Sequence, residues 1–228
     1  MAIKGSRLLV IAAHPDDEVL GCGGLLAANA AVGGEGSVLV VSEGSSAQNG
    51  GEKKAMTRRH EQLLQAAEIV GASDVEHWSY PDMRLDEVPH LELNGALQNY
   101  IAEKRFDTVL VHHPFDVNRD HQIVYRSALV ACRPAPHSPV DQLFTYHVNS
   151  STEWAFGGAS ERFCPTTFVD ISSVLDKKLE ALAVYEEELR EYPHPRSLEA
   201  VRNRALVFGS EAGLEAAEAF QLVYSRER

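Results

Sequence analysis

The feature of this sequence that most constrains its fold is a set of short apolar runs, each of which ends in a polar segment. Residues 8–13, 38–41 and 108–111 are rich in aliphatic and β-branched side chains and carry no charge. Such runs are typical of parallel strands that are buried on both faces of a sheet. We therefore predict strands there, and each polar segment then lies at the carboxyl edge of the sheet, where open α/β folds bind ligands.

Segments with a helical spacing of apolar residues separate these predicted strands. Residues 56–70 carry this spacing and stop at Gly71, a common residue after a helix C-terminus. Strands that alternate with helices indicate a doubly wound α/β fold, with a mostly parallel sheet, helices on both faces and a single domain over residues 1–228. The other expected elements are strands at 75–80, 142–149 and 167–170, helices at 25–31, 91–104, 121–132 and 171–192, and a loop at 43–53.

Composition excludes several classes of partner. The net charge of -12 argues against a nucleic acid or an anionic membrane surface, because both select clusters of Lys and Arg. No apolar run approaches the roughly 18 residues that span a bilayer. Three cysteines without a CxxC pair fit neither a disulfide framework nor a thiolate metal site. We expect a soluble, cytoplasmic protein with a small-molecule partner, no nucleic acid and no membrane, and a homo-oligomer is compatible with the sequence.

The first cluster of chemically competent residues is His14, Asp16 and Asp17, directly after the first predicted strand. An imidazole and a carboxylate three positions apart can converge on one ion, and a catalytic zinc usually takes three protein ligands and a water. A carboxylate that does not bind the ion can deprotonate that water. Glu18 we expect to favour the start of a helix, without a catalytic role. The alternative interpretation of the segment is a solvated loop with a helix cap.

A second polar cluster spans residues 112–121 and follows the third apolar run. If the strands are parallel, the two clusters meet at one edge of the sheet, so the second can supply the third metal ligand. We expect His121 to be that ligand, whereas His112 and His113 are expected to be packing or loop histidines. A closed, structural metal site would need a fourth protein ligand, which His113 or Asp116 could supply.

These motifs resemble those of the PIG-L/LmbE-like N-acetylglucosaminyl deacetylases, a family with a Rossmann-like fold. The sequence Ala-His-Pro-Asp-Asp-Glu at 13–18, with its trailing glycines, and the Asp-x-Asn-x-Asp-His element at 116–121 carry the resemblance. It extends to Arg59, to residues 80–85 and to the Pro-His-Pro-Arg-Ser motif at 193–197, and so covers most of the chain.

The resemblance implies a zinc ion held by His14, Asp17 and His121. It also implies that Asp16 acts as the general base on a metal-bound water, and that Asp120 lies behind the site and orients a neighbouring imidazole. The implied substrate-binding residues are Arg59, Asp82 and His194.

One position departs from the family pattern. Many members have a histidine three residues before the last zinc ligand, and this chain has Asn118 there. An asparagine amide can donate a hydrogen bond to an oxyanion, but it cannot act as a general acid near neutral pH. We expect Asn118 in the catalytic site, and the proton for the leaving amine to come from Asp16 or from His194.

The expected function is a zinc-dependent N-deacetylase that removes the acetyl group from an N-acetylglucosamine-type sugar or glycoconjugate. The same ligands would also accept Fe(II), Co(II) or Mn(II). The alternatives are hydrolysis of another amide, in a thiol or natural-product conjugate, and sugar binding without turnover. Gly21, Gly23 and Gly24 do not form GxGxxG, which disfavours a dinucleotide-binding oxidoreductase. They could cradle a phosphate, but we favour close packing.

Overall fold

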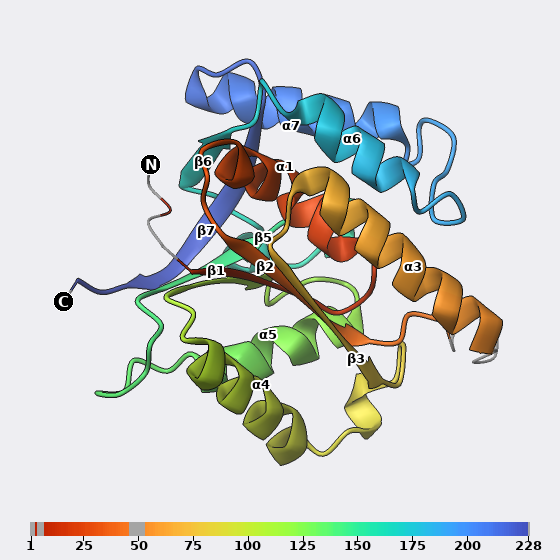
Figure 1. The fold of residues 1–228 in the computed structure, drawn as a ribbon. Coiled ribbons are helices and arrows are strands. Elements are labelled where there is room, and N and C mark those ends of the chain that lie inside the picture. The colour runs from red at the N-terminus through yellow and green to blue at the C-terminus, as the bar shows by residue number, and fades with distance from the viewer. Residues whose placement is uncertain (1–2, 4–6, 46–52, 228) are drawn as a thin grey trace.

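The structure is a computed structural model that describes residues 3, 7–45 and 53–227. A seven-stranded sheet separates two layers of helices (Figure 1). The strands are β1 (Leu8–Ala12), β2 (Gly36–Ser42), β3 (Asp74–Tyr80), β4 (Thr108–His112), β5 (Gln142–Tyr146), β6 (Thr167–Asp170) and β7 (Ala217–Ser225). The helices are α1 (Asp17–Ala31), α3 (Lys53–Val70), α4 (His90–Lys104), α5 (Arg119–Ala131), α6 (Leu175–Ala183) and α7 (Leu198–Ala212), with short 3-10 turns at Leu85–Glu87, Thr152–Trp154 and Ala159–Glu161.

The strand order is β3-β2-β1-β4-β5-β7-β6, and only the pairs that involve β7 are antiparallel. The chain moves outward from β1 through β2 to β3 and then returns to place β4 on the other side of β1. The boundary between β1 and β4 is therefore the topological switch point of the sheet, where α/β folds bind ligands. Both polar clusters of the sequence follow these two strands, so the fold brings them together.

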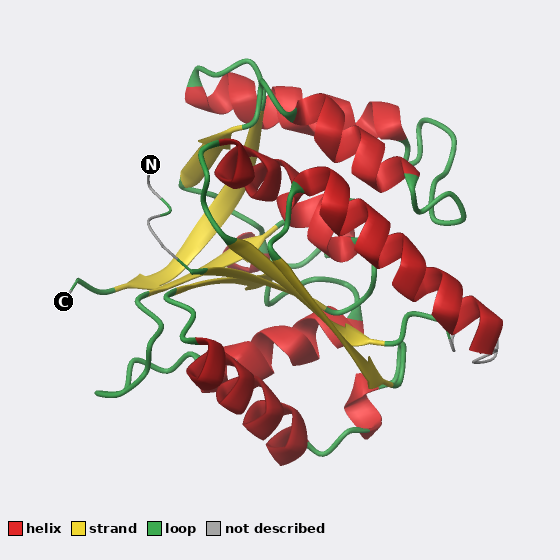
Figure 2. Ribbon diagram, in the orientation of Figure 1, coloured by secondary structure: helices red, strands yellow, loops and turns green. Residues whose placement is uncertain are grey.

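The two layers of helices bury opposite faces of the sheet (Figure 2). Helices α1, α3, α6 and α7 cover one face, and α4 and α5 cover the other. Strand β1 is buried along its whole length, and its side chains alternate between the two cores. This arrangement confirms the predicted single α/β domain, with a mostly parallel sheet and helices on both faces. In the described part of the chain, no helix has the length and apolar character needed to cross a bilayer.

Helix α1 begins earlier than predicted. The expected helix at 25–31 was too short, because α1 starts at Asp17 and includes the glycines after the motif. Acidic residues in a first helical turn interact favourably with the helix dipole, which explains the early start. A Cβ atom on Gly21 would lie 2.2 Å from the Tyr146 ring, and one on Gly24 would lie 2.7 Å from Ile171. The glycines therefore serve close packing, as we favoured.

The C-terminal third contains the largest differences from the sequence prediction. The helix predicted at 171–192 is wrong in both bounds, since α6 covers only Leu175–Ala183. Asp170 caps the preceding turn by accepting the N–H and hydroxyl of Ser172, which delays the helix start. Helix α7 and strand β7 were not predicted. The alanine- and glutamate-rich start of β7 has weak strand propensity, and pairing with β5 and β6 overrides it. The loop expected at 43–53 lies partly outside the described residues.

We predict opposite effects of adding a methyl group at two helical glycines. Gly21→Ala should lower the free energy of unfolding by about 1–3 kcal/mol, because the Tyr146 ring cannot move away while its hydroxyl donates to the Ile11 carbonyl at 2.8 Å. Gly95→Ala in α4 is the matched control, since no atom lies within 4 Å of its added Cβ. Alanine there should raise the free energy of unfolding by about 1 kcal/mol. Urea unfolding measures both, and equal effects would contradict the packing role of Gly21.

Candidate metal centre and active site

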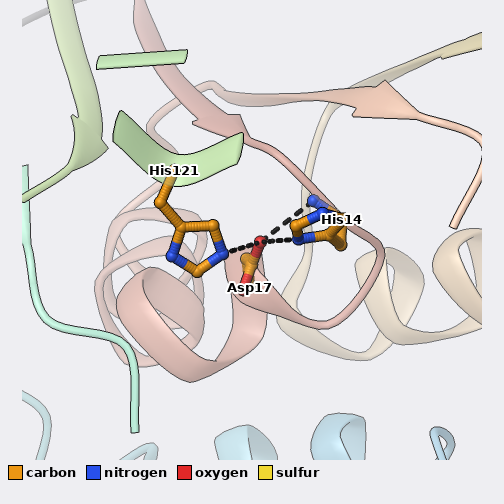
Figure 3. Close-up of side chains that lie close together, drawn as sticks. All are labelled: His14, Asp17 and His121. Atoms are coloured by element: carbon orange, nitrogen blue, oxygen red, sulfur yellow. Dashed lines mark hydrogen bonds and ion pairs between the residues drawn. The ribbon is translucent and has the colours of Figure 1, made fainter. Parts of the chain in front are cut away.

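The residues at the switch point form a compact group of two imidazoles and one carboxylate. His14 comes from the turn after β1, Asp17 from the first turn of α1, and His121 from the first turn of α5. Figure 3 shows the three side chains pointing toward one another. Asp17 Oδ2 lies 3.2 Å from both His14 Nδ1 and His121 Nε2, and one ligand atom from each residue lies within 4.8 Å of the others.

The chemistry of this group fits a divalent transition metal. Imidazole nitrogen and carboxylate oxygen are ordinary zinc ligands, and three protein ligands leave a position for water or substrate, as in catalytic sites. All three side chains are almost fully buried, with residue exposures of 9% for His14, 3% for Asp17 and 2% for His121. Burial of this kind keeps the ligand atoms fixed and limits competition from bulk water.

Two further carboxylates contact the outer nitrogens of His14 and His121, which are the ring nitrogens that do not face Asp17. Asp120 Oδ2 lies 3.2 Å from His14 Nε2, and Asp116 Oδ1 lies 3.2 Å from His121 Nδ1. A metal-binding histidine commonly donates its second N–H to a carboxylate, which fixes the tautomer and the ring orientation. Asp116 is held in turn by the hydroxyls of residues 151 and 152. The expected position of Asp120 behind the site matches this geometry.

His14, Asp82 and Asp120 form a second group with ligand atoms close together. This group uses the second ring nitrogen of the same imidazole. Asp82 Oδ1 and Asp120 Oδ2 lie 3.5 and 3.2 Å from His14 Nε2. A neutral imidazole has one lone pair and one N–H. If Nδ1 binds an ion, Nε2 is a donor, so Asp120, the nearer carboxylate, orients His14, while Asp82 also lies in the cavity wall.

Asp16 is held in a strained backbone conformation beside the metal ligands. Its φ of 122° is rare for a residue with a side chain, and such strain is concentrated at functional sites. The Glu18 carboxylate accepts the Asp16 N–H at 2.9 Å, and the Tyr185 hydroxyl donates to the same carboxylate. Burial raises the pKa of Asp16 to about 6, and the Arg196 guanidinium opposes that rise. Glu18 therefore supports the backbone of Asp16.

Asn118 caps helix α5. Its side-chain oxygen accepts the N–H groups of Asp120 at 2.9 Å and His121 at 3.4 Å. Its amide nitrogen lies 3.5 Å from the Met83 sulfur, a weak acceptor. An N-cap of this kind satisfies helix N–H groups that have no partner within the helix. In this chain Asn118 thus positions the residue expected as third ligand.

The other histidines near the site do not join the candidate ligands. His112 Nε2 accepts the Ala13 N–H at 2.8 Å, and its ring stacks on His121 with centroids 3.9 Å apart. His113 Nε2 donates to the Glu161 carbonyl at 2.9 Å. These contacts agree with the packing and loop roles expected for both. Because Asp116 faces the outer nitrogen of His121, neither it nor His113 closes the site as a fourth ligand.

A cavity of about 80 Å³ opens beside the three candidate ligands. The structure brings most of the predicted site residues into its wall, but it does not bring His194 there. His194 Nδ1 accepts the Arg196 N–H at 3.1 Å, and its ring packs edge-on against Trp154. Sequence reasoning missed Glu188 and Arg196, although Arg196 belongs to the same motif as His194. Besides the three candidate ligands, the wall contains Asp16, Arg59, Asp82, Asn118, Glu188 and Arg196.

Fold and site together define an α/β domain with a candidate metal centre at its switch point. Residues 9–132 match the PIG-L family, described as GlcNAc-PI de-N-acetylase. The chain belongs to this family, which confirms the resemblance seen in its motifs.

Three known proteins are similar to this chain in sequence or in fold. The uncharacterized deacetylase YaiS of Escherichia coli is 34% identical over 143 residues, which cover 59% of this chain and 72% of that protein. The 4-oxalmesaconate hydratase of Pseudomonas putida is 30% identical over 96% of this chain and 89% of its own length. The structure of N,N'-diacetylchitobiose deacetylase from Pyrococcus horikoshii shares the fold, with a TM-score of 0.78 and 18% identity over 97% of this chain and 85% of that one.

We predict that the carboxylate behind His14 sets the affinity for metal. Asp120→Asn should weaken zinc binding by about 10–100-fold, because the amide no longer accepts the His14 N–H as strongly. Asp86→Asn is the control, since Asp86 is exposed on a 3-10 turn. Competition with a chromogenic chelator measures both affinities. Equal zinc affinity in the two variants would show that Asp120 does not orient a ligand.

Proposed function

We propose that this protein is a zinc-dependent N-deacetylase that acts on an N-acetylated amino sugar or a glycoconjugate of one. The observation that supports this most is the position of Asp16, a buried carboxylate in the wall of the same small cavity as His14, Asp17 and His121. A carboxylate beside the ligands is expected of a hydrolytic site and not of a structural one. A cavity of about 80 Å³ also suits a group as small as acetyl.

The residues of the chain would divide the reaction between them. Zinc held by His14, Asp17 and His121 would polarise the acetamide carbonyl and lower the pKa of a water. Asp16 takes a proton from a water molecule beside it, and the oxygen of that water attacks the carbonyl carbon. Asp16 then returns the proton to the nitrogen as the C–N bond breaks. The products are acetate and a free amine. This role for Asp16 provides the general acid that Asn118 cannot supply.

Arg59 and Asp82 would bind the sugar. Arg59 is anchored by hydrogen bonds from Nη2 to the Pro15 carbonyl at 2.8 Å and from Nε to the Gly44 carbonyl at 3.2 Å. Its Nη1 is buried and makes no hydrogen bond within the described part of the chain. A buried donor without a partner is costly, so a substrate oxygen at this point would be bound favourably. Asp82 offers a carboxylate in the same wall, which suits a sugar hydroxyl.

The metal and the cellular setting are part of the proposal. We favour zinc, while Fe(II), Co(II) and Mn(II) suit the same imidazole and carboxylate ligands. Cys22, Cys132 and Cys164 are unpaired, which is compatible with a reducing cytoplasm. The partner is then a small molecule. The negative net charge of the chain offers little attraction for nucleic acid.

A hydratase is the second candidate function. The relative that covers 96% of this chain is a 4-oxalmesaconate hydratase, and that name describes the addition of water to an unsaturated acid. Arg59 and Arg196 both line the cavity, and guanidinium groups are well suited to carboxylates. The same base could activate water for either reaction. A hydratase would consume a carbon–carbon double bond and release no acetate.

The first function is tested by acetate release from a panel of N-acetylglucosamine derivatives, which are free, nucleotide-linked or glycosidic. Asp16→Asn should lower kcat by about 10²–10⁴-fold, because the amide cannot accept the proton. Zinc content should stay unchanged, since Asp16 is not an expected ligand. Asp176→Asn on the surface of α6 is the matched control and should keep full activity.

The same protein preparation separates the two functions. A conjugated unsaturated dicarboxylic acid loses its ultraviolet absorbance on hydration, so spectrophotometry detects a hydratase directly. Loss of absorbance that needs Asp16, with no acetate from any sugar, would replace the first proposal by the second. Acetate release that Asp16→Asn leaves intact would contradict the assignment of the base.

A further inference from the structure

The cavity wall contains one cationic side chain whose chemistry the reaction described above does not use. Arg196 belongs to the Pro-His-Pro-Arg-Ser motif between α6 and α7, and its guanidinium Nη1 lies 3.7 Å from Asp16 Oδ2. We propose that Arg196 is a catalytic residue that stabilises the negative charge developing on the acetyl oxygen of the substrate. This inference rests on the proposed deacetylase function.

The size of the cavity places Arg196 within reach of the reacting group. The cavity holds about 80 Å³, and Arg196, Asp16 and Asp17 share its wall. An acetyl group close enough to react with a water beside Asp16 therefore lies near the guanidinium as well. The Arg196 side chain is 30% exposed, so it faces the cavity without being fully solvated.

The guanidinium is held in place before substrate binds. Nε donates to the Ser150 hydroxyl at 2.6 Å, and Nη1 donates to Glu188 Oε2 at 2.7 Å. Ser150 has a positive φ of 70°, and its N–H is fixed by Glu153 at 2.8 Å. These bonds use Nε and Nη1, so a ligand could accept a further hydrogen bond from Nη2. Donors that are fixed in advance stabilise a transition state at little cost in reorganisation.

The charges around Arg196 also fit the course of the reaction. Before the reaction, Asp16 and Glu188 face the guanidinium, at 3.7 and 2.7 Å. When Asp16 takes the water proton it becomes neutral, and the electron pair of the carbonyl moves to the acetyl oxygen. One negative charge near Arg196 is thereby replaced by another on the substrate. The cation thus stays paired with a negative charge through the step, in a buried site where bulk water screens such pairing little.

Arg196 would complement Asn118, which lines the same cavity. The oxygen of Asn118 is committed to the cap of α5, and its amide is a neutral donor beside Met83. Hydrogen bonds from charged donors are roughly twice as strong as those from neutral donors. Among the donors of this wall, the guanidinium of Arg196 is therefore the stronger one for a developing negative charge.

Steady-state acetate release by the zinc-loaded full-length chain tests the role. Arg196→Ala should lower kcat by about 10²–10³-fold and change KM little, because the interaction forms mainly in the transition state. Free guanidinium ions in the buffer should restore part of that kcat, and they should not restore Asp16→Asn. Arg202→Ala is the matched control. Arg202 lies on the surface of α7 and pairs with the exposed Asp176 of α6, so this variant should behave as wild type.

Arg196→Gln and Arg196→Lys separate catalysis from structure. If the arginine only bridges Glu188 and Ser150, the loss would appear as a lower melting temperature or lower zinc content, and guanidinium ions would not restore activity. That result would overturn the proposal. A Lys variant that folds and binds zinc should recover more kcat than the Gln variant, because it keeps the charge.

A binding measurement tests the role of Arg196 without any substrate that the protein hydrolyses. Acetohydroxamate is small enough for the cavity, binds zinc as an anion, and contains no sugar. Calorimetry should give an affinity about 10-fold weaker or more for Arg196→Ala than for wild type or Arg202→Ala, at equal zinc content. Equal affinity would overturn the role of Arg196. Absence of acetate release by the wild type from every N-acetyl sugar would instead contradict the proposed function, and the acetohydroxamate comparison would still stand.

Discussion

The parallel pairing of β1 with β4 is the interaction on which the rest of the structure depends. It joins Leu8 to Thr108 and Val10 to Leu110, and so aligns the ends of two strands that are far apart in the sequence. The turn that carries His14 and the helix that carries His121 then begin at the same edge of the sheet. A shift of this register by two residues would move the two imidazoles apart by about 7 Å, more than a metal site tolerates.

The site concentrates buried charge, and the surrounding hydrogen bonds make this tolerable. Asp16, Asp17, Asp116 and Asp120 are all nearly inaccessible to water. A buried carboxylate is costly unless it is paired or hydrogen-bonded, and here each has an imidazole, a guanidinium, a hydroxyl or a backbone N–H as partner. The candidate metal ligands therefore belong to a network in which removal of one member leaves another unpaired. Such networks hold geometry well, and they also make the site sensitive to single substitutions.

Much of this arrangement could be predicted from the sequence, because the strongest signals are local. Uncharged apolar runs predicted the central strands, and polar residues at their ends predicted His14, Asp17 and His121 as neighbours. The C-terminal third could not be predicted in the same way. Strand β7 depends on antiparallel partners on both sides, and α6 ends at Ala183, well before Glu188 reaches the cavity wall. Arg196 was missed because its contacts with Asp16 and Ser150 join segments far apart in the sequence, and no spacing in the sequence reveals them.

The position of Asn118 links the start of a helix to the electrostatics of the cavity. Its side-chain oxygen accepts two N–H groups of α5, and so fixes both His121 and the carboxylate behind His14. A histidine at this position could titrate, but it caps a helix less well than asparagine. The candidate third ligand, His121, is therefore held rigidly, and the Asn118 side chain beside it is neutral. Positive charge in the cavity comes from Arg59 and Arg196, which share the carboxylate of Glu188. The helix cap and the positive charge thus come from different segments of the chain. These segments meet only when β1, β4 and the segment after α6 are all in place.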